Sequence, residues 1–204
     1  MGKWLLVRHA EAIWNSEGRI QGHVEVPLNE KGRAQAEALR RRLASVDIQA
    51  AYTSNLARAV ETTRVILRGR SVPLFPLPAL REFSYGLWEG LTFEEVEKNY
   101  PHEYARLMGD GEDFAPPGGE STKELVERIK GFVFSTKASN AEGTLLIVGH
   151  GGSLRALIIC LLELPNSAFW RLYLDPASLS EVEVYPQNAV LRLLNDTSHL
   201  RDER

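Results

Sequence analysis

The 204-residue sequence has one cysteine and two methionines, and its 24 Lys and Arg residues are outnumbered by 27 Asp and Glu residues. A single cysteine, Cys160, cannot form an internal disulfide, so the fold does not depend on an oxidising compartment. The formal net charge of -3 disfavours a nucleic-acid partner, because nucleic-acid-binding surfaces carry a basic excess. The composition therefore excludes a disulfide-stapled domain and points away from nucleic-acid binding.

Long hydrophobic runs are also absent. The longest apolar stretch, around Ala156 to Leu162, is too short to span a bilayer. The sequence enters a strand directly, without the basic segment, apolar run and cleavage site of a signal peptide. With 44% hydrophobic residues, enough for one core, we expect a single domain over residues 1–204 that is cytoplasmic and has no membrane partner. Association into a homodimer is left open.

What the sequence does contain is an alternation of strand-like and helix-like segments. Strands are predicted at 4–8, 48–54 and 143–152, with a proline-limited edge strand at 72–77 and a hairpin over 178–186 and 189–195. Helices are predicted at 29–46, 55–69 and 153–164. This order predicts an α/β fold, a three-layer α/β/α sandwich with a mostly parallel central sheet.

Residues 81–120 break this alternation. They contain short helical pieces and the loop "GDGEDFAPPGGES", and an insertion of this length in an α/β domain usually covers a site. We therefore expect a small helical cap here. The segment carries ten acidic residues against three basic ones, so the cap is expected to disfavour a second anionic group beside the site.

Polar residues stand at the ends of two predicted strands. Arg8 and His9 end the first strand, and His150 and Gly151 lie at the end of a later one, while Arg58 lies in the first turn of the helix 55–69. Ligands of parallel α/β sheets bind beyond the carboxyl ends of the strands, so these residues should converge. The arginine fork and the backbone N–H groups of a helix start both favour phosphate oxygens. The sequence therefore predicts a phosphate pocket.

The ordered blocks around these residues resemble the histidine phosphatase superfamily, also called the phosphoglycerate mutase-like family. The matching blocks are "LLVRHAEAIWN", "RIQGHVEVPLNEKGRAQA", "AAYTSNLARAVETT", "LREFSYGLWEGLTFEEV", "GGES" and "LLIVGHGGSLRALI". They cover about residues 3–162. Ala10 and Ala12 depart from the usual glycine and threonine or serine, which affects fine geometry and removes no catalytic group.

The resemblance implies a role for each residue of the predicted pocket. His9 would be the nucleophile that forms a phosphohistidine, Arg8, Arg58 and His150 would hold the phosphoryl group, and Glu82 would protonate the leaving group. For Arg58 the alternative is a surface salt bridge to Glu61 or Glu37, and for His150 it is a core histidine. For Glu82, the competing proton donor is Glu89, seven residues further along the chain.

Three further residues, Asn15, Gln21 and Gly22, are expected to line the entrance of the phosphate pocket, with turn-forming or surface roles as the alternative. His23 and His102 are expected at the surface, and His199 in an exposed tail. Five aromatic residues are expected either to form an apolar wall around a hydrophobic or neutral leaving group or to belong to the core. They are Trp14, Phe83, Tyr85, Trp88 and Tyr104.

These residues predict a metal-independent phosphomonoesterase that acts on a small-molecule phosphate ester and needs no cofactor. It resembles the broad-specificity and α-ribazole phosphatases of the family. One alternative is a cofactor-dependent phosphoglycerate mutase, although "EFSYGLWEG" lacks the R-H-Y-G pattern and longer insertion of the mutases. The other is a catalytically inactive phosphate-binding regulator. A metal site built from His9, His150 and Glu82 is disfavoured, because two nearby arginines would repel the cation.

Overall fold

The computed structural model describes residues 2–109, 113–139 and 142–203. Its centre is a six-stranded sheet in the order β3-β2-β4-β1-β5-β6. The strands are β1 (Gly2–Arg8), β2 (Ala50–Ser54), β3 (Leu74–Leu77), β4 (Gly143–Gly149), β5 (Leu179–Val184) and β6 (Ala189–Asp196). The first four run parallel, and the hairpin of β5 and β6 adds two antiparallel strands at one edge. The prediction of a mostly parallel α/β sheet is confirmed.

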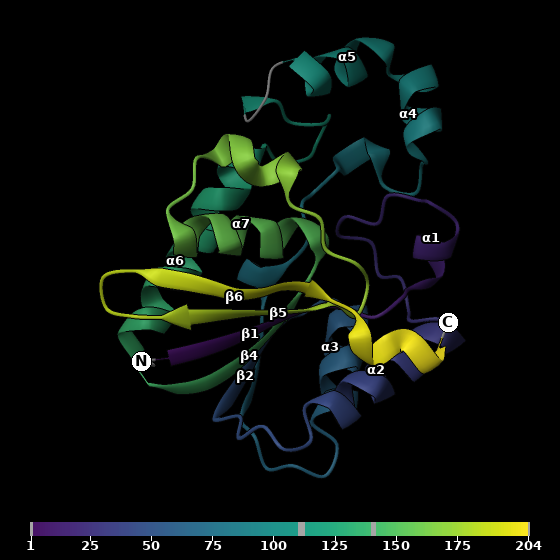
Figure 1. Ribbon diagram of the computed structural model, residues 1–204. Helices are drawn as coiled ribbons and strands as arrows, with labels where there is room; N and C mark the ends of the chain where they lie inside the picture. The colour runs from purple at the N-terminus through teal and green to yellow at the C-terminus, as the bar shows by residue number, and fades with distance from the viewer. Residues whose placement is uncertain (1, 110–112, 140–141, 204) are drawn as a thin grey trace.

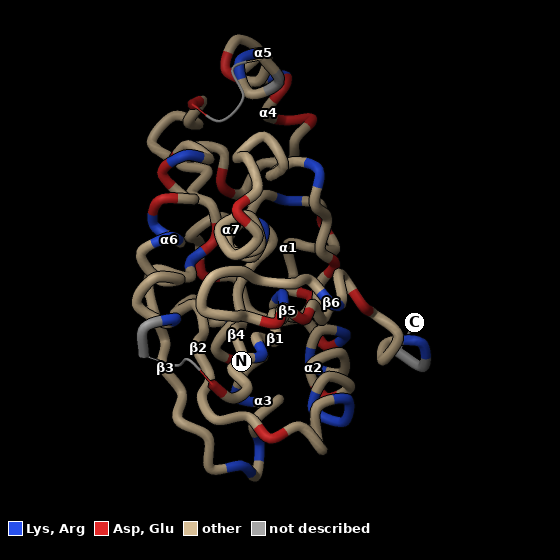
Figure 2. The backbone as a smooth tube through the Cα atoms, turned by 60° about the vertical axis from the view of Figure 1, so that its left-hand side comes forward, with Lys and Arg blue, Asp and Glu red and all other residues tan. Residues whose placement is uncertain are grey.

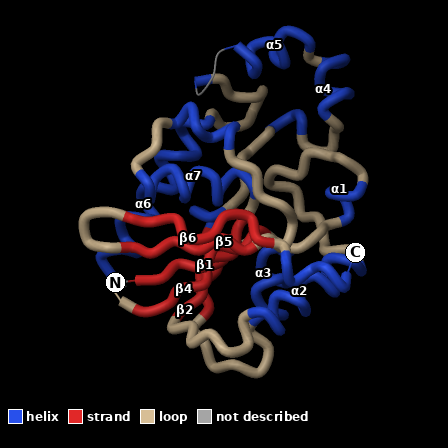
Figure 3. The backbone as a smooth tube through the Cα atoms, in the orientation of Figure 1, coloured by secondary structure: helices blue, strands red, loops and turns tan. Residues whose placement is uncertain are grey.

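Helices cover both faces of this sheet (Figures 1 and 3). On one face lie α6 (Thr122–Ser139) and α7 (Gly151–Leu162), and on the other lie α2 (Glu30–Arg42) and α3 (Ala57–Ile66). Successive residues of β1 point to opposite faces of the sheet. Accordingly Trp4 and Leu6 pack in the core beneath α6 and α7, and Leu5 and Val7 in the core beneath α2 and α3.

The longest helix, α6, was absent from the sequence-based prediction. Its start carries a visible signal, because Ser121 Oγ accepts from the Glu124 N–H and Glu124 Oε2 accepts from the Ser121 N–H. This reciprocal pair is a capping box. Apolar residues then recur at helical spacing and are buried, including Leu125, Ile129 and Phe132.

Short helices surround one end of the sheet. They are α1 (Ile13–Ser16), α4 (Phe93–Asn99) and α5 (Pro101–Gly109), with single 3₁₀ turns η1 (Pro78–Leu80) and η2 (Gly86–Trp88) and longer 3₁₀ segments η4 (Asn166–Arg171) and η5 (Ser198–Glu203). The helical pieces predicted in the cap correspond to α4 and α5, which stand at the top of Figure 1. Two of the ten acidic residues counted for the cap, Asp110 and Glu112, lie outside the described residues. None of the described helices is both long and apolar enough to cross a membrane.

Charge is unevenly distributed over the backbone (Figure 2). Arginines gather along α2 and around the end of α3, whereas α4 carries three glutamates against one lysine. Several of the α2 and α3 arginines are paired: Arg33 with Glu61, and Arg40 and Arg68 with Glu37. Arg58 itself is fully buried and its guanidinium donates to the backbone carbonyls of Val24 and Gly22, so the alternative of a surface salt bridge is wrong.

Gly32, in the first turn of α2, sets how closely this helix approaches the loop after His9. A Cβ atom at Gly32 would lie 2.0 Å from the carbonyl oxygen of Glu11. We expect Gly32→Ala to lower the free energy of unfolding by about 1–3 kcal/mol, because the helix and the loop must separate. Urea unfolding monitored by circular dichroism measures this.

Gly131→Ala in α6 is the matched control, because a Cβ there meets no other group within 4 Å. It should raise the free energy of unfolding by about 0.5–1 kcal/mol through helix propensity. A Gly32→Ala variant as stable as wild type would show that α2 adjusts freely against the loop.

Candidate functional site

One pocket of about 150 Å³ lies beyond the carboxyl end of β1. Seven of the nine predicted site residues line it: Arg8, His9, Asn15, Gln21, Gly22, Arg58 and Glu82. The lining also includes residues that the sequence reasoning did not select, namely Gly18, Arg19, Ile20 and Phe93, together with Tyr85 from the expected aromatic set. The remaining two predicted residues, His150 and Gly151, lie directly beside this pocket, as the following contacts show.

The sheet register brings the two histidines together. Arg8 pairs with Gly149 across β1 and β4, and the His9 N–H donates to the Gly149 carbonyl at 2.9 Å. The residues that follow each strand therefore leave the sheet at the same level. The ring centroids of His9 and His150 lie 5.0 Å apart in an edge-on arrangement. This is the convergence expected at the carboxyl ends of neighbouring parallel strands.

A backbone carbonyl fixes the tautomer of His9. Nδ1 lies 2.7 Å from the carbonyl oxygen of Ala10, and a carbonyl can only accept, so Nδ1 carries the proton. Burial, followed by the charges of Arg58 and Arg8, holds the His9 pKa well below its usual range. The neutral ring consequently keeps an unprotonated Nε2, which is the nucleophilic nitrogen of imidazole.

His150 is held in the opposite tautomer. Arg58 Nε donates to His150 Nδ1 at 3.2 Å, so Nδ1 accepts and Nε2 carries the proton of the neutral ring. Burial, then Arg58, keeps the pKa of His150 well below its usual value as well. Its Nε2 is buried and has no hydrogen-bond partner among the described residues. The ring therefore offers a donor beside His9 that nothing in the described chain uses.

Backbone carbonyls, rather than carboxylates, accept hydrogen bonds from Arg8 and Arg58. Arg58 is fully buried, and its Nη1 and Nη2 donate to the carbonyls of Val24 and Gly22 at 2.8 and 2.7 Å. Arg8 Nη1 donates to the carbonyl of Leu174 at 2.5 Å. Desolvation lowers the pKa of Arg58 to about 10 and lowers the pKa of Arg8. Both groups remain cationic at neutral pH, and their charge is left over for a ligand.

Three buried polar atoms around the pocket lack a hydrogen-bond partner within the part of the chain described: Arg8 Nε, His150 Nε2 and Gln21 Oε1. Buried polar groups are nearly always paired in folded proteins. Two of the three are donors, and the third belongs to an amide whose oxygen and nitrogen are assigned from the hydrogen-bond network alone. An unpartnered N–H on the Arg8 guanidinium and one on His150, beside the guanidinium of Arg58, are the features of a site for an oxyanion.

Glu82 is fixed through one of its two carboxylate oxygens. Oε1 accepts from the N–H groups of Phe83 and Gly152 at 2.8 Å and from that of Ser153 at 3.3 Å. A Cβ placed on Gly151 would lie 3.7 Å from Oε2, so this oxygen lies over the start of α7. Because three donors occupy Oε1, Oε2 is the oxygen available to carry a proton.

Glu89, the competing acid, is engaged elsewhere. Its Oε1 accepts from the backbone N–H groups of His23 and Tyr85 at 3.0 and 3.2 Å. It also packs against Gly22, whose φ of +47° and lack of a side chain permit the contact. Glu89 thus ties the loop 21–23 to the cap.

His23 was expected at the surface and is half-buried instead. Its Nε2 lies 2.9 Å from the carbonyl oxygen of Glu82, so this loop also holds the backbone beside the carboxylate. His199 likewise lies partly buried, with Nε2 2.9 Å from the Ala177 carbonyl. Ala177 in turn donates its N–H to the carbonyls of Arg8 and His9, so the tail supports the pocket from behind.

The aromatic wall differs from the expected one. Trp88 is fully buried inside the cap and Phe83 is buried in the main core, so neither reaches the pocket. Tyr85 does line it, together with Ile20 and Phe93, which the sequence reasoning missed. Phe93 is the first residue of α4, where only its position in the cap could have signalled a role.

No group of three or more His, Cys, Asp and Glu side chains suited to a metal ion occurs in residues 2–109, 113–139 and 142–203.

Asn15 and Arg19 complete the polar side of the pocket. Asn15 Oδ1 accepts from the Ala12 N–H, which closes the start of α1. Arg19 pairs with Glu17 and Glu95 at 3.2 Å, so its charge is neutralised.

The low pKa values of His9 and His150 predict the pH dependence of stability. In the unfolded chain histidine titrates near pH 6.5, so the unfolded state binds more protons than the folded state below that pH. The free energy of unfolding should therefore fall as the pH drops below about 6.5, by up to about 1.4 kcal/mol per pH unit for each buried histidine.

Chemical denaturation of the ligand-free protein between pH 5 and pH 8 measures this slope. His150→Gln should make it shallower, and substitution of the exposed His102 by Gln is the matched control. A slope that His150→Gln leaves unchanged would mean that His150 is protonated in the folded state.

Residues 4–197 match the histidine phosphatase superfamily, branch 1. The chain is 32% identical over 200 residues to phosphoserine phosphatase 1 of Hydrogenobacter thermophilus, covering 98% of this chain and 95% of that protein. It is 33% identical over 203 residues to the adenosylcobalamin/α-ribazole phosphatase of Salmonella typhimurium, covering 100% of both.

Among solved structures, a putative α-ribazole-5'-P phosphatase from Escherichia coli superposes with a TM-score of 0.90 at 29% identity, over 95% of this chain and 96% of that one. The likeness thus extends over the sheet, the pocket and the cap alike. The chain belongs to branch 1 of the histidine phosphatase superfamily.

Proposed function

We propose that this protein hydrolyses phosphate monoesters of small molecules through a phosphohistidine on His9, without a metal ion. The observation that carries the proposal is the neutral His9 ring, whose Nδ1–H is held by the Ala10 carbonyl beside the buried Arg58 and the half-buried Arg8. A fixed tautomer and a site for a dianion are the two requirements for nucleophilic attack by imidazole on phosphorus. The named relatives, which are phosphoserine and α-ribazole phosphatases, support the same reaction class.

In the first step, the Nε2 lone pair of His9 attacks phosphorus and the ester oxygen leaves. Positive charge from Arg8 and Arg58, with the His150 Nε2–H, stabilises the charge on the equatorial oxygens. These donors are already in place, so little reorganisation is needed as charge develops. The unpartnered Arg8 Nε and His150 Nε2 supply two of the hydrogen bonds.

Glu82 acts as general acid in the first step and as general base in the second. An alkoxide is a poor leaving group, so Oε2 delivers a proton to the ester oxygen as the bond to phosphorus breaks. The resulting carboxylate then takes a proton from the water that attacks the phosphohistidine. Phosphate and neutral His9 are released, and Glu82 is again protonated for the next cycle. Three N–H donors on Oε1 fix the orientation of the carboxyl group in both steps.

Phosphohistidine formation is shared with the mutase alternative, so the acceptor of the phosphoryl group separates the two. The mutases would return it to a second phosphorylated substrate. The one cation of the pocket beyond Arg8 and Arg58, Arg19, is paired with two carboxylates in the described structure. This leaves it poorly suited to a second phosphate and favours water.

His9→Ala should lower kcat for p-nitrophenyl phosphate by at least about 10³-fold, the scale of loss on removing a nucleophile. Rapid acid-free quenching and mass spectrometry should place phosphate on His9 of the wild type. Wild-type turnover should survive EDTA and be inhibited competitively by inorganic phosphate. His102→Ala is the control for the loss of an exposed imidazole.

Each competing function has its own signature in these measurements. Loss of activity with EDTA and recovery with added metal would establish the metal site. A mutase rate with 2,3-bisphosphoglycerate comparable to hydrolysis would establish the mutase. Absence of any phosphate release from aryl phosphates by the wild type would leave a phosphate-binding regulator.

Glu82→Gln tests whether Glu82, rather than Glu89, is the general acid. An alkyl phosphate needs a protonated leaving group and p-nitrophenyl phosphate largely does not, so the first step should slow about 10²–10⁴-fold only with the alkyl ester. Single-turnover kinetics isolate this step from dephosphorylation. Glu89→Gln keeps an amide oxygen to accept the two N–H groups and is the control. An equal loss on both substrates would remove Glu82 from the role of general acid.

A further inference from the structure

Gln35, in the second turn of α2, is a polar side chain in a buried position, with 6% of its surface exposed. Moving an amide out of water costs free energy unless the amide forms hydrogen bonds. Its Oε1 accepts from the Glu11 N–H at 2.9 Å. Because an N–H group can only donate, this contact identifies the amide oxygen. The bond therefore fixes the orientation of the Gln35 side chain.

The same peptide unit holds the nucleophile. The Glu11 N–H and the Ala10 carbonyl belong to one planar peptide group. The carbonyl accepts from His9 Nδ1 at 2.7 Å on one side, and the N–H donates to Gln35 on the other. A continuous chain of hydrogen bonds thus runs from the imidazole through one peptide unit to α2. Rotation of this peptide would break both bonds, so Gln35 sets the direction of the carbonyl that selects the His9 tautomer.

The preceding peptide unit is held separately by α3. The Ala10 N–H donates to Thr62 Oγ1 at 3.1 Å, and that hydroxyl donates to the Arg58 carbonyl at 2.8 Å. Ala10 is fully buried between these contacts. Thr62 thus fixes the peptide before Ala10, whereas Gln35 fixes the one after it, whose carbonyl contacts His9.

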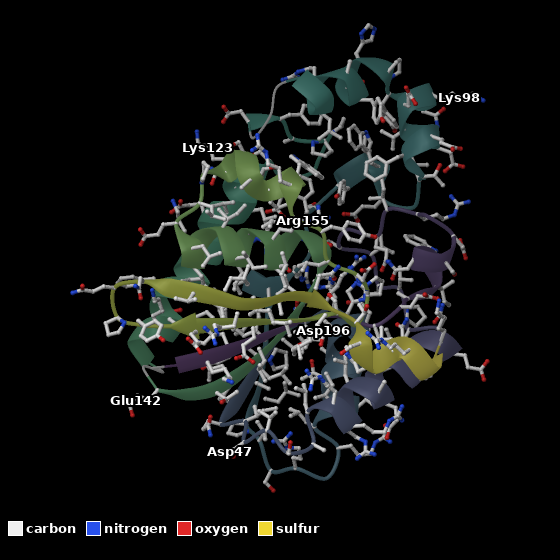
Figure 4. All side chains as sticks on the ribbon, viewed as in Figure 1. Asp47, Lys98, Lys123, Glu142, Arg155 and Asp196 are labelled. Carbon is white, nitrogen blue, oxygen red and sulfur yellow. The ribbon has the colours of Figure 1, made fainter. Side chains whose placement is uncertain are left out.

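The position of α2 makes the Gln35 contact possible. Gly32 lies one turn before Gln35, on the same face of the helix. A Cβ there would lie 2.0 Å from the Glu11 carbonyl oxygen, so its absence lets α2 approach the loop closely. At the other end of α2, Arg42 pairs at 3.6 Å with Asp196, which Figure 4 labels at the end of β6. Gln35 therefore acts from a helix that is fixed to both the loop and the sheet edge.

Phosphoryl transfer places a positive charge on this chain of hydrogen bonds, because the His9 ring becomes cationic when Nε2 bonds to phosphorus. Burial, then the charges of Arg58 and Arg8, lower the pKa of His9, whereas its hydrogen bond to the Ala10 backbone raises that pKa. The Ala10 carbonyl is thus a group that favours the cation. Donation by the N–H of the same peptide polarises this carbonyl and strengthens its bond to the ring. The Gln35 oxygen consequently stabilises the transition state more than the ground state.

We propose that Gln35 is a positioning residue for the nucleophile: it orients the Ala10 carbonyl, which keeps the proton on His9 Nδ1 and stabilises the cationic ring during phosphoryl transfer. Gln35 lies behind the loop, where it lines a cavity of about 220 Å³ together with Glu11 and Asp175. It should therefore alter the chemical step and leave the affinity for phosphate unchanged. The proposal rests on the proposed phosphatase activity.

Gln35→Met keeps the length of the side chain and removes the acceptor. In single-turnover reactions with p-nitrophenyl phosphate, the limiting rate of phosphohistidine formation should fall by about 10–100-fold, the range for a hydrogen bond to a charged group. The dissociation constant of inorganic phosphate should not change, since Arg8, Arg58 and His150 hold the phosphoryl group under the proposed function. Gln35→Glu retains an acceptor oxygen and should restore most of the rate.

Nitrogen NMR chemical shifts of the histidine rings report the tautomer directly. The wild type and Gln35→Glu should carry the His9 proton on Nδ1, and Gln35→Met should show a mixture with the Nε2–H form. Gln49→Met is the matched control, because Gln49 Oε1 also accepts a backbone N–H, that of Thr144, at the amino end of β4. It should change neither the rate nor the tautomer.

A wild-type limiting rate in Gln35→Met, or an unchanged His9 tautomer in that variant, would overturn the proposal. A Gln35→Glu variant as slow as Gln35→Met would do the same. Should Gln35→Met fail to fold by circular dichroism, the wild type and Gln35→Glu still decide. In both, vanadate bound at the phosphoryl position should move the Glu11 amide proton downfield, because charge on the ring strengthens the chain of hydrogen bonds. An amide proton that does not move contradicts the proposed role.

Failure of the proposed function has a different signature. In that case the wild type releases no phosphate from p-nitrophenyl phosphate and accumulates no phosphohistidine. Full wild-type activity that Gln35→Met retains overturns only the role of Gln35.

Discussion

The site depends on two guanidinium groups, those of the fully buried Arg58 and the half-buried Arg8, neither of which forms a salt bridge with a carboxylate in the described structure. Removing a charge from water costs free energy, and hydrogen bonds to the backbone carbonyls of Gly22, Val24 and Leu174 offset part of that desolvation. A carboxylate in their place would neutralise the arginines and compete with phosphate. Dipoles hold the arginines in position and leave their net charge intact. The loops that supply these carbonyls must therefore place them within hydrogen-bond distance of Arg8 and Arg58.

Burial, reinforced by the same charges, sets the protonation of both histidines. A buried imidazole beside Arg58 is disfavoured as a cation, so His9 and His150 stay neutral, and one hydrogen bond on each ring selects the tautomer. The outcome is complementary: one ring presents a lone pair and its neighbour presents a proton. The two roles proposed for them, nucleophile and oxyanion donor, would thus be filled by one residue type through different hydrogen-bond partners. The lone pair, the N–H donor and the positive charges are in place before a ligand binds, which is electrostatic preorganisation.

Much of this was predictable from the sequence, because strand ends and family motifs are local patterns. Arg8, His9, Arg58 and Glu82 line one pocket, as expected from their positions after predicted strands and within the motifs. The parts that were missed depend on chain segments distant in sequence. His23 contacts Glu82, 59 residues away, and nothing in "QGHVEV" signals that contact.

The missed helix α6 has a different cause. Its capping box and apolar spacing are present in the sequence between the cap and β4, so local pattern alone is sufficient to predict this helix. The aromatic residues could not be sorted by type, since Trp88, Phe83 and Phe93 differ only in their tertiary surroundings. Burial is decided by packing, and packing is not a property of a short stretch of sequence.

The cap has a small core of its own, formed by Ile20, Trp88, Val96 and Phe114, apart from the two cores that flank the sheet. Substitutions inside it can change the cap side of the pocket, which Ile20 lines, while Arg8, His9 and Arg58 keep the positions that β1 and α3 give them. Under the proposed function, the substrate and the chemistry can therefore vary separately. A phosphatase built this way could acquire a new substrate through changes in one outer module, with the residues around His9 unchanged.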